Sequence, residues 1–169
     1  MYKKGIILIL MTCILSSCMS LDIQKDMYRQ INEYLGSRNW SIVEKIEADD
    51  VRILMIEHQG EYVIFNFSDE SIVKFHGAYT IEKNSVQYKE VLMNQYLFIL
   101  VFGWNHQKHM DHYELVLSND DQTMRISEDV SDKSTFMALC PAVTFFPLEV
   151  VVYDDAGDII MKGKEYGTT

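Results

Sequence analysis

Apolar residues recur with the period of an α-helix over the segment from Asp22 to Leu35. The apolar positions of this segment are Ile23, Met27, Ile31, Tyr34 and Leu35. Ser20 or Asp22 suits the start of a helix as a capping residue, and Gly36 stands where a left-handed residue commonly ends one. The pattern predicts one amphipathic helix over residues 22–35.

After Gly36 the spacing of apolar residues changes to that of strands rich in branched and aromatic side chains. Gln59 and Gly60 form a tight-turn signal between two of these strands. We therefore expect residues 22–93 to form a unit in which the amphipathic helix packs on an antiparallel β-meander. The predicted strands of this unit are Trp40–Ala48, Val51–His58, Glu61–Phe67, Ile72–Thr80 and Val86–Leu92.

The second part of the chain is also strand-like and more hydrophobic. Its segment Tyr96–Trp104 is a nearly unbroken apolar run, which is typical of a central strand covered on both faces. The polar stretch from Ser127 to Ser134 predicts the longest loop. Short strands separated by turn signals favour a β-sandwich-like unit over residues 94–169. Its other predicted strands are Tyr113–Ser118, Thr123–Ile126, Thr135–Leu139, Val143–Phe146, Leu148–Tyr153 and Asp158–Met161.

These elements together predict an α+β fold that is mostly antiparallel β-structure. We place the boundary between the two units at Met93 and Asn94, although no linker rich in Pro, Gly or Ser marks it. A single continuous domain that joins residues 22–93 to residues 94–169 is the open alternative. The 152 residues after residue 17 are enough for either arrangement.

The N-terminal segment has the features of a secretory signal peptide. Lys3 and Lys4 precede an apolar run, and small residues follow it. The sequence Leu15-Ser16-Ser17-Cys18 resembles the lipobox of bacterial lipoproteins. The resemblance implies that the Cys18 thiol receives a diacylglyceryl group, that residues 1–17 are cleaved off, and that acyl chains such as palmitate anchor the mature protein. Residues 18–21 would then serve as the anchor and a short tether.

A transmembrane helix is the alternative interpretation of this apolar run. Crossing a bilayer core takes about 20 apolar residues, and the run from Gly5 to Met19 is shorter and contains polar residues. The lipoprotein interpretation therefore places the mature protein in the cell envelope, on the extracytoplasmic side of a bacterial membrane. Met19 is not an acid, so an aspartate retention signal is absent, which indicates the outer membrane if the organism is Gram-negative.

Charge and cysteine content narrow the possible partners. Loss of residues 1–17 removes two lysines and no acid, so the net charge moves from −10 to −12. A domain this acidic is not expected to bind nucleic acid.

Cys13 leaves with the signal peptide and Cys18 becomes a thioether, which leaves Cys140 as the one free thiol and excludes an intramolecular disulfide. We expect Cys140 to be a small buried hydrophobe.

The segment from Trp104 to His112 holds the strongest candidates for a ligand site. His106, His109 and His112 are spaced by three residues, and neutral imidazole is a common ligand for divalent metals. Neither a strand nor a helix would point all three in one direction, so a metal site here requires an irregular loop. The alternative is a solvated hairpin tip that joins Tyr96–Trp104 to Tyr113–Ser118.

No sequence motif assigns an enzymatic activity. The chain lacks a G-x-S-x-G elbow, a Walker loop, an S-x-x-K motif and a Cys-x-x-Cys pair, so we predict no catalytic residues. The acidic stretches, such as Asp154-Asp155-Ala156-Gly157, are typical of turns and lack the spacing of a calcium loop. We expect a non-enzymatic binding or assembly module with an envelope protein as partner and no cofactor. The alternative is a lipoprotein that binds a divalent metal or another small ligand through the three histidines.

Overall fold

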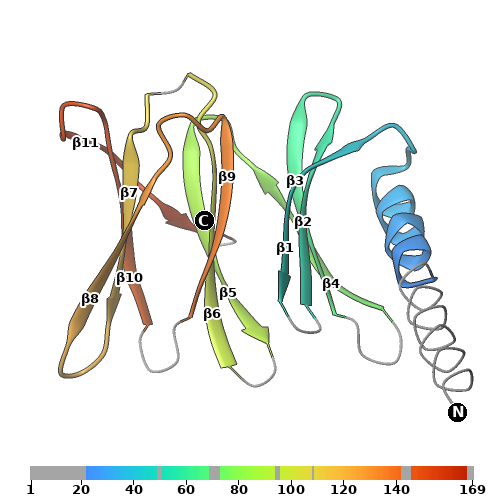
Figure 1. Ribbon diagram of the computed structural model, residues 1–169, viewed down its shortest axis with the longest axis horizontal. Helices are drawn as coiled ribbons and strands as arrows, with labels where there is room; N and C mark the ends of the chain where they lie inside the picture. The colour runs from blue at the N-terminus through green and yellow to red at the C-terminus, as the bar shows by residue number, and fades with distance from the viewer. Residues whose placement is uncertain are drawn as a thin grey trace, which may run out of the picture.

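The protein is described by a computed structural model, which places residues 22–48, 51–68, 73–93, 96–107, 109–141 and 146–166. The expected signal peptide, the anchor residue Cys18 and the tether lie outside these described residues. Over these described residues the fold is mostly antiparallel β-structure, with three four-stranded sheets and one helix. Figure 1 shows that the three sheets stack face to face, and that the helix covers the outer face of the first sheet.

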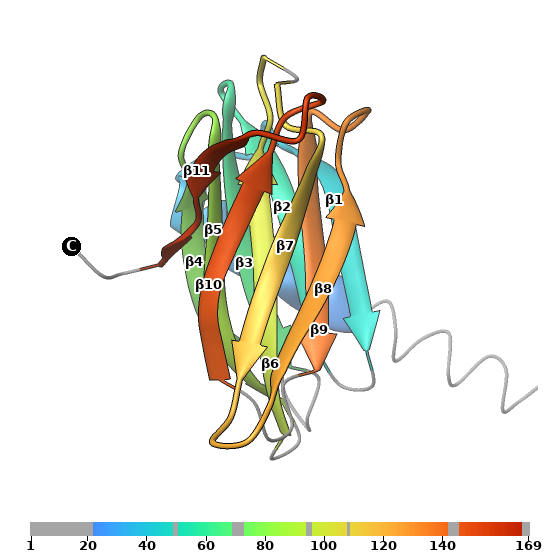
Figure 2. The ribbon, with the colours of Figure 1, turned by 90° about the vertical axis from the view of Figure 1, so that its left-hand side faces the viewer.

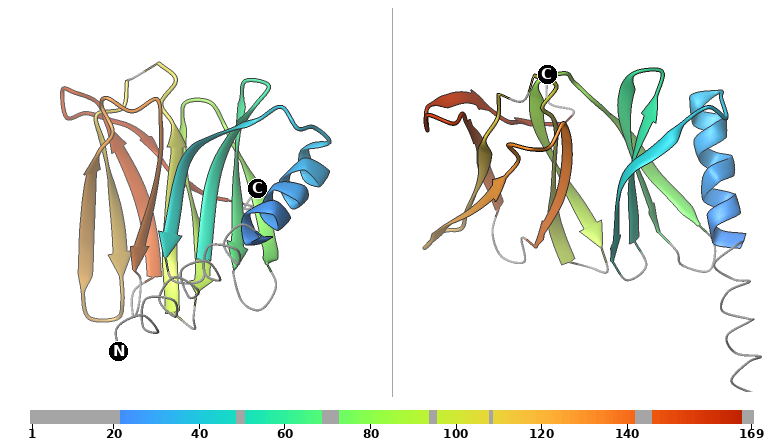
Figure 3. Two further views of the ribbon diagram at one scale, coloured as in Figure 1. Left: turned by 45° about the vertical axis from the view of Figure 1, so that its right-hand side comes forward. Right: turned by 45° about the horizontal axis from the view of Figure 1, so that its top comes forward.

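The first sheet contains four of the five strands of the predicted meander, whereas the fifth, predicted at Val86–Leu92, joins the middle sheet as β5 (Ser85–Met93). Its strands β1 (Ser41–Ala48), β2 (Val51–His58), β3 (Glu61–Ser68) and β4 (Lys74–Ile81) are antiparallel neighbours in sequence order. Residues 22–35 are helical, and Gly36 follows with a φ of 62°. The helix buries Met27 and Ile31 against this sheet. The left view of Figure 3 shows the helix lying against the face of the sheet. The sheet residues of this core are Leu54, Ile56, Val63, Phe65 and Phe67.

The middle sheet has the order β12 (Lys164–Glu165), β5 (Ser85–Met93), β6 (Tyr96–Trp104) and β9 (Thr135–Pro141). Strand β6 is internal to this sheet and is covered on both faces. Ile99 and Val101 belong to the core shared with the third sheet, whereas Leu100 and Phe102 belong to the core shared with the first. The predicted central position of Tyr96–Trp104 is therefore confirmed.

The third sheet has the order β11 (Ile159–Lys162), β10 (Phe146–Tyr153), β7 (His112–Ser118) and β8 (Thr123–Asp129). Figure 2 looks onto its outer face, and no other element of the described part of the chain covers it. This face carries ion pairs between Arg125 and Glu114 (2.8 Å) and between Lys162 and Glu149 (2.6 Å). Such polar residues alternate along the strands with buried ones, as expected for a sheet with one solvated face.

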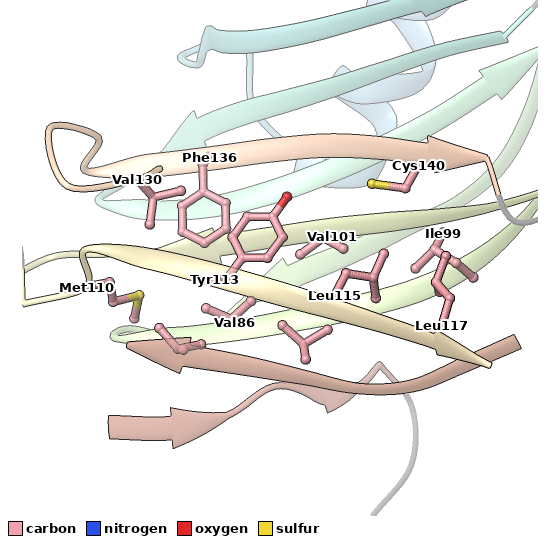
Figure 4. Packing of buried hydrophobic residues seen from close by; sticks show 12 residues of the cluster. Val86, Ile99, Val101, Met110, Tyr113, Leu115, Leu117, Val130, Phe136 and Cys140 are labelled. Carbon is pink, nitrogen blue, oxygen red and sulfur yellow. The ribbon is translucent and has the colours of Figure 1, made fainter. Parts of the chain in front are cut away.

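The core between the middle and third sheets contains an aromatic pair formed by Tyr113 and Phe136 (Figure 4). Tyr113 and Phe136 stack with their ring centroids 5.5 Å apart, and both side chains are buried. Gly103 lies against the Phe136 ring, where a Cβ atom would overlap the ring and lie 2.9 Å from the carbonyl oxygen of Ser85. The absence of a side chain at residue 103 therefore lets the aromatic pair fill this layer.

The sheets divide the chain differently from the two expected units. Strands β5 and β6 pair along their whole length, from Ser85 opposite Trp104 to Met93 opposite Tyr96. The expected boundary at Met93 and Asn94 thus falls within one hairpin. The middle sheet shares a core with each of the other sheets, so the stacking is continuous across that boundary. Packing of the middle sheet on the third is compatible with the sandwich expected for the second part.

Two predictions of local structure were wrong. The expected loop at Ser127–Ser134 begins later, because β8 continues to Asp129 and pairs Glu128 with Tyr113. Strands β6 and β7 do not form a hairpin, because β6 pairs with β5 and β9 whereas β7 pairs with β10 and β8. The segment between them therefore crosses from one sheet to another. The predicted strand over Val143–Phe146 lies partly outside the described residues.

Candidate functional site

Four connections between strands meet at one end of the stacked sheets, which comes forward in the right view of Figure 3. They are the turns β4–β5 and β10–β11 and the crossings β6–β7 and β8–β9. They enclose a cavity of about 480 Å³, which we call the end groove. Its described lining residues are Asn84, Asn105, Gln107, His109, Met110, Asp111, Ser131, Asp154, Asp155, Ile160 and Met161.

The β6–β7 wall of the end groove is held by Asn105, whose side chain is 1% exposed. Its Nδ2 donates to the carbonyl oxygens of Met110 (3.0 Å) and Val130 (3.3 Å), and its Oδ1 accepts from the Met110 N–H (3.2 Å). One amide group therefore satisfies three buried backbone groups of two connections. These hydrogen bonds hold the loop in place, although it contains no regular secondary structure.

Further backbone contacts join the same loop to its neighbours. The Asp111 N–H donates to the carbonyl of Tyr153 (2.8 Å), and the Val130 N–H donates to the carbonyl of Asp111 (2.8 Å). The Gln107 N–H donates to the Asn84 Oδ1 (3.3 Å), which ties the loop to the β4–β5 turn. The walls of the end groove are thus bonded to one another as well as to their own strands.

The β10–β11 turn supplies two carboxylates with different roles. The Asp154 Oδ1 accepts from the N–H groups of Ala156 (3.1 Å) and Asp158 (2.9 Å), so it stabilises the turn itself. Gly157 has a φ of 82°, as the turn prediction for this sequence requires. Asp155 is exposed and lines the end groove. Asp155 is therefore the carboxylate of this turn that is better placed to contact a ligand.

The structure does not bring the three candidate histidines together. His106 is exposed and its ring centroid lies 5.7 Å from that of Trp104. His109 lines the end groove. His112 already belongs to β7, where it stacks on Tyr153 at 4.6 Å. Its Nδ1 lies 2.9 Å from the Asp111 Oδ2.

A metal site at these histidines gains no support from this arrangement. Over the described ranges, no three His, Cys, Asp or Glu side chains group in a way that could hold a metal ion. His106 and His109 lie in the connection between β6 and β7, whereas His112 lies in β7, so the three side chains have separate surroundings. Of the three, His109 alone shares the end groove with the carboxylates.

A partly exposed polar cluster at the border of the core was missed by the sequence analysis. The Tyr113 hydroxyl donates to the Glu128 Oε2 (2.8 Å), and the Lys133 Nζ lies 3.0 Å from the Glu128 Oε1. Burial, followed by the bond to Glu128, raises the pKa of Tyr113, so the hydroxyl remains a donor. Burial also raises the pKa of the Glu44 carboxyl on β1. The cluster went unseen because the sequence pattern placed Glu128 in a loop rather than opposite Tyr113.

Cys140 is a free, buried cysteine in the core between the middle and third sheets, as expected. Burial, followed by the nearby charge of Glu128, raises the pKa of its thiol. A nucleophilic cysteine requires surroundings that favour the thiolate. The surroundings of Cys140 favour the neutral thiol, as suits a packing residue.

No helix within the described part of the chain is long and apolar enough to span a membrane. In comparisons with known proteins, no protein-family model, curated protein or solved structure matches the chain.

Proposed function

We propose that this protein is a lipid-anchored, non-enzymatic binding module of the bacterial cell envelope that receives a cationic group in its end groove. The observation that carries the proposal is the chemistry of the groove. Asp111, Asp154 and Asp155 line it, and its described lining residues include neither Lys nor Arg. Three carboxylates in one concave site favour a positively charged ligand.

The remaining lining residues suit an organic cation. Met110 is buried, and Met161 is half-buried beside it. The exposed part of the Met161 side chain offers an adaptable apolar surface for the methylene groups of an amine. Asn84, Gln107 and Ser131 add amide and hydroxyl groups that accept hydrogen bonds from an ammonium or guanidinium group.

The position of the helix supports the anchoring part of the proposal. In Figure 1 the first described residues of the helix point toward the end of the molecule opposite the four connections that enclose the end groove. Four residue steps separate Cys18 from Asp22, and they span at most about 14 Å. Acyl chains on Cys18 would therefore hold that end near the membrane and leave the groove directed away from it. We also infer that the middle sheet packed on the third forms the β-sandwich expected for residues 94–169.

Thermal unfolding of the mature chain, with Cys18 replaced by Ser to prevent acylation, tests the groove. The probes are N-acetyl-lysine amide, cadaverine and arginine, with citrate as an anionic control. A ligand that binds only the folded state and is present at 100 times its dissociation constant stabilises that state by about 2.7 kcal/mol. We expect the cationic probes to raise the unfolding temperature and citrate to leave it unchanged. No rise with any cationic probe would overturn the cation site.

Two aspartate variants locate the binding site. Asp155→Asn removes a charge from the end groove, whereas Asp120→Asn removes the same charge from the exposed β7–β8 turn at the other end. We expect Asp155→Asn to weaken amine binding and Asp120→Asn to leave it unchanged. Equal losses from the two variants would show that only the overall charge matters. Lys108 lies outside the described residues, and Lys108→Ala should not weaken amine binding.

The anchoring and the metal alternative have separate tests. Mass spectrometry of the protein extracted from membranes should show acyl chains on Cys18, and an unmodified thiol there would contradict the lipoprotein assignment.

The thermal unfolding assay also tests the metal alternative. A rise in unfolding temperature with zinc, copper or nickel that disappears when His106, His109 and His112 are replaced by Ala would favour metal binding instead.

A further inference from the structure

We propose that the cationic group is a lysine or arginine side chain of an extended partner segment, which adds as a new strand to the edge of β11 beside the end groove. This inference rests on the proposed function, because it uses the same groove and names the class of partner. It adds a second contact surface, the strand edge, that a free amine would not use.

Strand β11 offers an open and apolar edge. It is the outermost strand of the third sheet, and over the described ranges it pairs with β10 alone. Ile159 is 59% exposed and Ile160 is 39% exposed. An unprotected edge of this kind presents backbone N–H and C=O groups to another chain, and large apolar side chains strengthen the contact.

The opposite edge of the same sheet is built differently. Strand β8 carries three charged residues, Arg125, Glu128 and Asp129. Strand β11 carries one, Lys162, which pairs with Glu149 of β10. Charged side chains on an edge strand discourage pairing with a further strand. The contrast between β8 and β11 indicates that pairing is blocked at one edge of the third sheet and left open at the other.

The end groove and the β11 edge are continuous. Ile160 and Met161 of β11 themselves line the groove, and Asp155 precedes the strand in the β10–β11 turn. Side chains of an added strand would alternate between two faces, so one basic side chain could enter the groove while its neighbours contact Ile159. Carboxylates inside the groove then select a basic residue at that position.

Isothermal titration calorimetry on the unacylated mature chain separates the two contacts. The probe is a blocked five-residue peptide of alternating threonine and valine with lysine at its centre. We expect it to bind at least about tenfold more tightly than N-acetyl-lysine amide, which corresponds to about 1.4 kcal/mol. The same peptide with N-methylated backbone amides should lose this advantage, and a version with norleucine in place of lysine should lose most of its affinity.

Hydrogen exchange of the backbone amides distinguishes strand addition from an effect of charge alone. The lysine peptide should slow amide exchange over residues 159–162, whereas N-acetyl-lysine amide should not. Asp155→Asn should weaken peptide binding at least about fivefold, or about 1 kcal/mol, while Asp120→Asn leaves it unchanged.

The outcomes distinguish this inference from the proposed function. If the free amine binds but the peptide gains nothing, or if the N-methylated peptide binds equally well, the strand-addition inference is overturned and the cation site stands. If neither amine nor peptide binds, the cation site itself is wrong.

Discussion

The Asn105 side chain pairs with the backbone of Met110 through both of its polar atoms, donating from Nδ2 at 3.0 Å and accepting at Oδ1 at 3.2 Å. The amide thus replaces the bonds that a neighbouring strand would supply. It does so where the chain leaves the middle sheet for the third, and regular pairing is interrupted there. The shape of the end groove therefore depends on a residue that is itself buried.

Asn105→Leu should lower the free energy of unfolding by about 2–4 kcal/mol, because it leaves buried N–H and C=O groups of Met110 and Val130 without partners. Urea denaturation measures the loss. Asn119→Ala is the matched control, because its Oδ1 also accepts from two backbone N–H groups but in an exposed turn. Its cost should be about 1 kcal/mol or less, since water can replace the lost bonds. Equal costs for the two variants would contradict the role assigned to Asn105.

Gly103→Ala should destabilise the protein by about 1–3 kcal/mol, because the added methyl group overlaps the Phe136 ring and approaches the Ser85 carbonyl. A thermal unfolding curve measures the effect. Phe136→Leu alone should also destabilise, since it loses the ring stacked on Tyr113. The double variant should lose less than the sum of the two single losses, because leucine leaves room for the new methyl group. Strict additivity would show that the overlap is relieved elsewhere.

Tyr113→Phe removes the hydroxyl of a fully buried tyrosine, which donates to the partly exposed Glu128 carboxylate at 2.8 Å. A hydrogen bond to a charged group typically contributes about 1.5–3 kcal/mol, so we expect a loss of that size in urea denaturation. Tyr153→Phe removes a similar bond, to Glu114 at 3.2 Å, on the solvated face of the third sheet. This control should lose clearly less, and a larger loss at Tyr153 than at Tyr113 would refute the argument from burial.

Glu44→Gln should make the protein more stable at neutral pH. Burial is the main cause that raises the pKa of this carboxyl above its ordinary value of 4.5, and the charge of Glu128 adds to it. The charge of Lys133 and a backbone hydrogen bond from Met137 act in the opposite direction. The folded state therefore binds this proton more tightly than the unfolded state does. The stabilisation that the proton provides is present below pH 4.5 and is lost as the pH rises through the raised pKa.

The comparison of wild type and Glu44→Gln across pH tests this sign. The variant should gain relative to wild type as the pH rises from 4 to 8, and the two should converge in acid. Glu47→Gln on the same strand is the control, because Glu47 is exposed and pairs with Arg52 at 2.9 Å. It should show no comparable gain with rising pH. A gain at Glu44 that is largest in acid would contradict the assigned direction.

Local spacing along the chain determined most of the secondary structure. Runs of β-branched and aromatic residues predicted the strands of the first meander. The apolar run of Tyr96–Trp104 predicted a strand that is buried on both faces. Turn chemistry placed a bend at residues 154–157, where Gly157 has the positive φ that the turn needs. These features follow from nearest neighbours in sequence, so one chain suffices to predict them.

Only the tertiary structure decided which strands pair and which connections meet. Whether β6 turns back as a hairpin or crosses to another sheet depends on contacts with β9 and β10, far along the chain. The extension of β8 to Asp129 depends on its pairing with β7, in which Glu128 lies opposite Tyr113 and accepts a hydrogen bond from the Tyr113 hydroxyl. Likewise, three histidines close in sequence lie apart, whereas Asn84, Asp111 and Asp155 line one groove. Local pattern specifies which residues favour a strand, but pairing and site geometry arise from long-range packing, which a single sequence does not display.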